Sequence, residues 1–132
     1  MSNFTVVAAI VATGLFLAMS AFQAALAAGA PLGAHVLGGR QSGTLPSRLR
    51  LFSGIAAVLL LAFAFIVLAR AGVIGSAAGA AGFLAVACWI VAGFLVLNTL
   101  SNLASKSRLE RTVLAGTTAV LAVLCSYVAW TA

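Results

Sequence analysis

The sequence predicts an all-α membrane protein: a bundle of four transmembrane helices in one domain that covers residues 1–132. Apolar residues make up 64% of the chain and charged residues only 6%, whereas about a quarter of the residues in a soluble domain are charged. Four apolar stretches are each about 20 residues long, the length that a helix needs to cross ~30 Å of hydrocarbon at ~1.5 Å per residue. Each stretch is apolar on all its faces, as expected of helices in contact with lipid.

The first predicted helix covers residues 3–28. Within it, Ala25-Leu26-Ala27 resembles the cleavage site of a secretory signal peptide. Against that interpretation, no Lys or Arg precedes the segment, and its apolar stretch exceeds the roughly 7–15 residues of a signal peptide. We therefore expect a retained transmembrane helix.

The other predicted helices cover residues 51–73, 79–101 and 112–130. The segment 29–47 is rich in glycine and contains both prolines, so it is expected to form turns rather than helix. The segment 74–78 is expected to form a tight hairpin connection.

The basic residues predict the orientation. Six of them lie in the first and third connections or at their margins: Arg40, Arg48, Arg50, Lys106, Arg108 and Arg111. Only Arg70 lies near the other side, so the positive-inside rule places both connections in the cytoplasm and both termini outside, in the bacterial inner membrane. The six side chains are candidate contacts for anionic lipid headgroups or for a partner. No aromatic-interleaved basic patch accompanies the net charge of +6, so we expect no nucleic-acid partner.

No catalytic, cofactor or metal site is predicted, and the chain is not expected to be an enzyme. General acid–base catalysis needs a titratable group beside the reacting proton, and Glu110 is the only acid and His35 the only histidine. We expect Glu110 to form a solvated ion pair with Arg108 or Arg111, and His35 to lie at the level of the headgroups. The predicted spans contain no acidic residue, which disfavours a cation-coupled antiporter.

Four residues within or at the ends of the spans carry separate expectations. Cys88 and Cys125 are expected to differ in depth by ~6 Å, which argues against a disulfide, and neither has a second metal ligand at a suitable spacing. Trp89 lies near the middle of its span and is expected to pack in the bundle interior or, alternatively, to line a pocket. Arg70 is expected to extend toward the headgroups.

One polar side chain from each predicted helix lies at a similar depth near the cytoplasmic side. Gln23, Ser53, Asn98 and Thr117 lie within roughly 8 Å of that boundary at ~1.5 Å per residue, with Asn102 at the rim. One interpretation is a small polar vestibule that faces the cytoplasm. The other, which we favour on the sequence alone, is hydrogen bonding between helices, worth ~0.6 kcal/mol per bond.

The two halves of the chain share a short pattern. Ser47-Arg48-Leu49-Arg50 and Ser107-Arg108-Leu109-Glu110-Arg111 lie 60 positions apart (107 minus 47) and lead into the second and fourth helices. A tandem repeat of two helical hairpins would produce this pattern, as in some small transporters. Two unrelated helices that both start at the cytoplasmic side would also begin with basic residues, and we favour that explanation.

Several longer strings in the two predicted cytoplasmic connections resemble those of other proteins. They are Gly29-Ala30-Pro31-Leu32-Gly33, Gly38-Gly39-Arg40, Leu45-Pro46-Ser47-Arg48-Leu49-Arg50, Asn102-Leu103-Ala104-Ser105-Lys106-Ser107 and Glu110-Arg111. Over about half of the chain, these strings resemble a group of small bacterial four-helix inner-membrane proteins. An aromatic residue often stands in that group where His35 stands here, so no special role is expected for His35. The resemblance implies the fold and the location, and no activity.

The leading functional hypothesis is a non-enzymatic accessory, scaffold or interaction subunit that presents two basic cytoplasmic loops. One alternative is a small transporter or channel that uses the polar layer. Four helices of one chain seldom enclose a wide pore, so a channel would need a homodimer or a larger membrane complex. Another alternative is a protein that binds anionic lipid through its basic loops.

Overall fold

The computed structural model describes residues 2–39, 41–75 and 81–132, and the regular structure of this part is entirely helical. The long helices are α1 (Asn3–Ala27), α2 (Ser47–Arg70), α3 (Ala81–Leu103) and α4 (Ala115–Thr131), and a π-helical turn, η4 (Glu110–Leu114), leads directly into α4. With η4 and α4 counted together, all four are long and apolar enough to cross a membrane. The prediction of an all-helical chain with four candidate membrane-spanning helices is confirmed.

The helix ends differ from the predicted ones at the basic residues. Pro46 occupies the N-cap position of α2 in an extended conformation, so the helix begins at once with Ser47 rather than near residue 51. Arg48 and Arg50 therefore belong to the first turn of α2 and not to a loop. The predicted start of the third helix, residues 79–80, lies outside the described residues.

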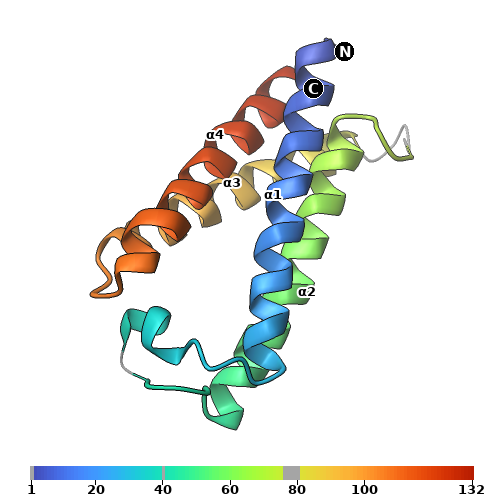
Figure 1. Cartoon of the computed structure of the whole chain (residues 1–132). Coiled ribbons are helices and arrows are strands. Elements are labelled where there is room, and N and C mark those ends of the chain that lie inside the picture. The colour runs from blue at the N-terminus through green and yellow to red at the C-terminus, as the bar shows by residue number, and fades with distance from the viewer. Residues whose placement is uncertain (1, 40, 76–80) are drawn as a thin grey trace.

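The four helices form two antiparallel hairpins, α1 with α2 and α3 with α4 (Figure 1). The hairpins meet at the end where both termini lie and diverge toward the opposite end. We call these the terminal end and the loop end, because the latter carries the connections 28–46 and 104–109. At the terminal end, Thr5 Oγ1 shares a hydrogen bond of 2.8 Å with Thr131 Oγ1, and this bond joins α1 to α4.

The terminal half of the bundle is tightly packed around small side chains. Ala9 and Ala12 of α1 are fully buried, and small residues allow helix backbones to approach closely. Toward the middle, the ring of Phe16 meets Phe63 edge-on at 6.0 Å, and Phe63 meets Phe94 at 5.4 Å. This aromatic row runs from α1 through α2 to α3 and ends the closed half of the bundle.

The two cysteines lie side by side across α3 and α4. Both are free and buried, and Cys88 Sγ donates a hydrogen bond of 3.5 Å to the carbonyl oxygen of Cys125. The thiol of Cys88 therefore reaches the backbone of Cys125 across the interface of the two helices, and the expected difference in depth stays a prediction.

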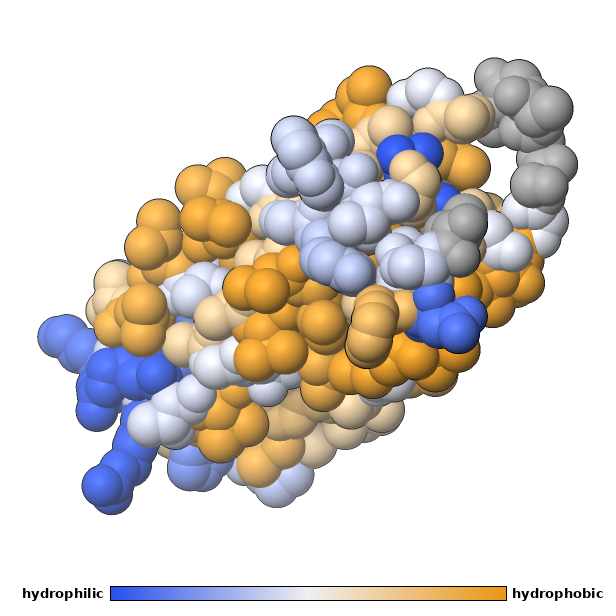
Figure 2. Space-filling view, turned by 90° about the horizontal axis from the view of Figure 1, so that it is seen from above, coloured by the Kyte–Doolittle hydropathy of each residue, from blue (hydrophilic) through white to orange (hydrophobic). Residues whose placement is uncertain are grey.

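On the face seen in Figure 2, apolar side chains cover much of the surface, while strongly hydrophilic residues gather in separate clusters. Trp89 belongs to this outer surface and is 45% exposed, so the expectation that it packs in the interior is wrong. α3 turns Cys88, Val91 and Leu95 inward. Because successive residues of a helix differ by about 100° in direction, the neighbour of Cys88 faces outward.

Arg70 also departs from its expected position. Its Nη2 donates a hydrogen bond of 3.1 Å to the carbonyl oxygen of Ala129 instead of extending outward. A cation beside the last carbonyls of a helix is favoured by the helix dipole. Arg70 thus ties the end of α2 to the end of α4 and reinforces the closed terminal end.

The aromatic row leads to a prediction about stability. In a soluble core, replacing Phe by Ala costs about 3–5 kcal/mol. Lipid is as apolar as the core, so only the packing part remains, and we expect Phe16→Ala to lower the free energy of unfolding by about 1–3 kcal/mol. Unfolding in mixed detergent and dodecyl sulfate measures this. The matched control is Phe83→Ala: Phe83 is 73% exposed, so its replacement should change the free energy of unfolding little. Equal losses in both variants would contradict the packing described here.

Candidate functional site

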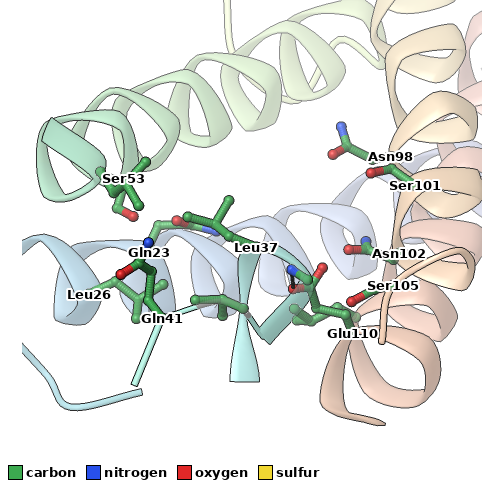
Figure 3. A pocket seen from close by; sticks show the side chains of 14 residues that line it. Gln23, Leu26, Leu37, Gln41, Ser53, Asn98, Ser101, Asn102, Ser105 and Glu110 are labelled. Carbon is green, nitrogen blue, oxygen red and sulfur yellow. Dashed lines mark hydrogen bonds between the residues drawn. The ribbon is translucent and has the colours of Figure 1, made fainter. Parts of the chain in front are cut away.

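A cavity of about 590 Å³ lies between the diverging hairpins at the loop end (Figure 3). Its walls come from α1, α2, α3, η4 and the connection between α1 and α2. The lining residues are Gln23, Leu26, Val36, Leu37, Gly38, Gln41, Leu49, Ser53, Asn98, Ser101, Asn102, Ser105, Glu110 and Leu114. The volume falls within the range of roughly 300–1,000 Å³ that is typical of small-molecule sites.

The polar lining consists mainly of neutral amides and hydroxyls. Gln23, Asn98 and Asn102 present side-chain amides toward the cavity, with serines among them (Figure 3). The amide of Asn98 donates a bond of 3.2 Å to Phe94 O in its own helix. No hydrogen bond within the described residues engages the amide of Gln23 or Asn102. Since an amide both donates and accepts, these groups remain available to water or to a solute.

The predicted polar layer is assembled except for one member. Gln23, Ser53, Asn98 and Asn102 all line the cavity, whereas Thr117 does not. Instead, Thr117 Oγ1 donates a bond of 2.8 Å to the carbonyl oxygen of Val113 in the preceding turn. Counting residues from a helix end gives the depth of a side chain and not its direction. The additional residue in the π-helical turn η4 rotates everything after it by about 100°.

Thr118 faces inward in place of Thr117. It is 1% exposed and shares a hydrogen bond of 2.8 Å with Thr99 of α3. Sequence analysis also missed Gln41, Ser101 and Ser105 as lining residues. The sequence did hold a signal for the two serines. Positions 98, 101, 102 and 105 are three or four residues apart, which places their side chains on one face of a helix.

A second, smaller chamber of about 100 Å³ continues from the cavity into the bundle. Gln23 and Asn98 line both spaces. The remaining lining of the chamber is mostly apolar, and it includes Phe63 and Phe94 of the aromatic row. The two amides therefore stand between a polar cavity and a narrow apolar chamber that ends at the closed half of the bundle.

Residues 33–39, which we call the strap, cover part of the cavity. The strap consists of two short 3₁₀ turns, η1 (Gly33–His35) and η2 (Leu37–Gly39). It is held against α1 through an apolar cluster of Leu26, Val36 and Leu45, each at most 5% exposed. Figure 1 shows it reaching from the first hairpin toward the connection between α3 and α4.

Two hydrogen bonds join the strap to the second hairpin. Gly38 N donates to Glu110 Oε1 at 3.0 Å, and Ser107 Oγ donates to the carbonyl oxygen of His35 at 2.5 Å. Ser107 also accepts a bond of 3.4 Å from the backbone N–H of Glu110. The strap therefore bridges the two hairpins where they are furthest apart.

The conformation of the strap is strained at Leu37. Its φ is 51°, and the next two residues, Gly38 and Gly39, have φ of 76° and 75°. Glycine adopts such values freely, but for a bulky residue they cost on the order of 1–3 kcal/mol. Strained residues persist only where their surroundings hold them. Here the bond from Gly38 to Glu110 directly follows the strained residue.

The expected solvated ion pair of Glu110 is wrong. Glu110 is 8% exposed because the strap folds over the start of η4, and its carboxylate accepts the bond from Gly38. Arg111 Nη1 donates instead to the carbonyl oxygens of Ser105 and Lys106, at 3.2 and 3.0 Å. His35 contributes its backbone carbonyl to the contact with Ser107.

The other basic candidates stay outside the cavity. Arg48, Lys106 and Arg108 are exposed, and Arg50 Nε donates a bond of 3.0 Å to the carbonyl oxygen of Ala27 at the end of α1. Arg40 lies outside the described residues. Within the described residues, no group of three or more His, Cys, Asp or Glu side chains is placed to hold a metal ion.

Comparison with known proteins adds no relative. No protein-family model matches the chain, and no curated protein and no solved structure matches it either. The geometry of the cavity is therefore the basis for any functional conclusion.

The close packing of the strap at Gly33 leads to a prediction about hydrogen–deuterium exchange. Gly33 N donates to Gly43 O at 2.7 Å, and a Cβ at Gly33 would lie only 2.6 Å from that oxygen. Gly33→Ala should therefore displace the strap and raise the rate of hydrogen–deuterium exchange in the strap peptide roughly tenfold, as for a cost of about 1.4 kcal/mol. Gly116→Ala, with nothing within 4 Å of the new Cβ, is the control. Unchanged exchange in Gly33→Ala would contradict the described closure.

Proposed function

We propose that this chain is a multi-pass membrane protein that binds a small, neutral, polar solute in the loop-end cavity and carries it across the membrane. The observation that carries the proposal is the set of side-chain amides that face the cavity from helices apolar enough to span a membrane. A buried polar group without a partner is costly. Amides such as those of Gln23 and Asn102 therefore favour a cavity filled by water or solute over hydrogen bonding between helices.

The chemistry of the lining supports a neutral solute. Glu110 is the one acidic residue of the chain, and its carboxylate already accepts a bond from the strap. The exposed basic residues Lys106 and Arg108 lie outside the lining. Amides and hydroxyls pair well with hydroxyl or amide groups of a solute. A polyol, a small sugar or a small amide would suit the volume and the donors.

Passage would require the closed terminal half to open. The two hairpins are joined there by the Thr5–Thr131 bond and by Arg70, and at the loop end by the strap. A rocking motion of one hairpin against the other would exchange the open and closed ends, as in transporters built from repeated units. The tandem repeat of two helical hairpins is part of this proposal.

The positive-inside rule supports the orientation in which the loop end faces the cytoplasm and both termini face outward. The cavity would then open toward the cytoplasmic side of a bacterial inner membrane. The hypothesis of an accessory or scaffold subunit rests on the basic connections alone. The cavity gives the transporter an additional observation, so we prefer it.

Osmotic measurements on proteoliposomes test the proposal. Vesicles that contain the protein should equilibrate faster than protein-free vesicles with at least one solute among glycerol, urea, acetamide and a monosaccharide. Asn98→Ala should lower the rate of entry of that solute about 2- to 10-fold, because one hydrogen bond of roughly 0.5–1.5 kcal/mol is lost. Its amide bonds only within α3, so the fold should persist.

Thr117→Ala is the control, since this residue was predicted at a similar depth but lies outside the cavity lining. Equal slowing by both variants, or rates equal to those of protein-free vesicles for every solute, would contradict the proposal.

A further inference from the structure

An apolar groove runs along the outer side of the first hairpin, separate from the cavity. Its volume is about 710 Å³, and none of its lining residues lines the cavity. It is lined by α2 from Ser47 and Arg50 past Gly54 to Ala62, together with Ala27 of α1. Leu51 and Val58 are 66% and 67% exposed. The groove is therefore open to the surroundings of the bundle.

The groove depends on small residues where α1 and α2 lie together. Gly54 has no side chain, and a Cβ built there would meet the Cβ of Ala27 at 3.8 Å, an ordinary contact distance. A Cβ at Gly54 is therefore accommodated beside α1, and the atoms beyond it would extend over the groove that Gly54 lines. Filling this position is a direct way to close the groove.

Polar donors are found at only one end of the groove. Arg50 Nε donates to the carbonyl oxygen of Ala27, which fixes the guanidinium at the end of α1. Within the described residues, no hydrogen bond engages its Nη groups or the hydroxyl of Ser47. A guanidinium with free N–H groups suits a phosphate group, and a neighbouring hydroxyl adds a donor.

The dimensions of the groove match one leaflet of a bilayer. From Arg50 to Ala62 the groove follows α2 for about 18 Å, at ~1.5 Å per residue. Half of the hydrocarbon thickness is about 15 Å. The cation at one end complements the phosphate of a phospholipid, and the apolar channel that follows has the length of an acyl chain in one leaflet.

We propose that this groove is a binding site for an anionic phospholipid. The phosphate contacts Arg50 and Ser47, and one acyl chain lies along the groove past Gly54 toward Ala62. This site is independent of the solute cavity, so either proposal can fail while the other stands.

Native mass spectrometry of the intact protein tests the site, with phosphatidylglycerol and phosphatidylcholine of identical acyl chains as probes. The wild type should retain one phosphatidylglycerol with clear preference over phosphatidylcholine. Gly54→Leu, which fills the groove and keeps Arg50, should weaken this binding roughly tenfold. Arg50→Gln should remove the preference between the two lipids.

Matched controls separate this site from lipids held elsewhere on the surface. Gly116→Leu places the same side chain on an exposed part of α4 with nothing within 4 Å of its Cβ, and Arg108→Gln removes an exposed charge. Both should bind like the wild type. Undiminished phosphatidylglycerol binding by Gly54→Leu, equal retention of both lipids by the wild type, or a dimer that Gly54→Leu dissociates would overturn the proposal.

Discussion

The close packing of the two hairpins at the terminal end is the constraint on which the rest of the structure depends. Buried alanines bring the backbones together there, and Thr5 and Arg70 add hydrogen bonds between helices. Because the helices are straight and tilted (Figure 1), hairpins that meet at one end must diverge at the other. The polar cavity occupies the space that this divergence leaves.

The strap is a consequence of the same divergence. It covers part of the cavity, which Val36, Leu37 and Gly38 help to line. The connection between α1 and α2 folds back and bonds to Ser107 and Glu110 across the gap, and the strained backbone at Leu37 is part of that reach. The only acid of the chain is thus used to hold a closing segment. This contact acts together with the bond from Ser107 to His35 and with the apolar cluster of Leu26, Val36 and Leu45.

Much of the fold could be predicted from composition and the length of apolar stretches, because these are local properties. The same local reasoning grouped Gln23, Ser53 and Asn98, and the structure brings all three to the lining of one cavity. It failed for Thr117, since depth does not determine which way a side chain points and a π-helical turn changes that direction. Trp89 was misplaced because its depth in the helix likewise did not determine the direction of its side chain.

The contact between Glu110 and the strap lay beyond local reasoning altogether. Its partners are 72 positions apart in the chain, and no spacing rule relates a loop glycine to an acid at a distant helix start. The apolar groove beside Arg50 was equally hidden, because it depends on how α1 and α2 lie against each other.

Water access to Asn98 tests the central claim most directly. Asn98→Cys and Leu97→Cys place a thiol at adjacent positions of α3, one in the cavity and one on the outer surface, where Leu97 is 67% exposed. The native cysteines are fully buried, and maleimides react with the thiolate, which forms in water and not in lipid. A membrane-impermeant maleimide applied from the loop end should label Asn98→Cys and leave Leu97→Cys unlabelled. Equal labelling of the two, or none of either, would contradict a water-accessible cavity between the hairpins.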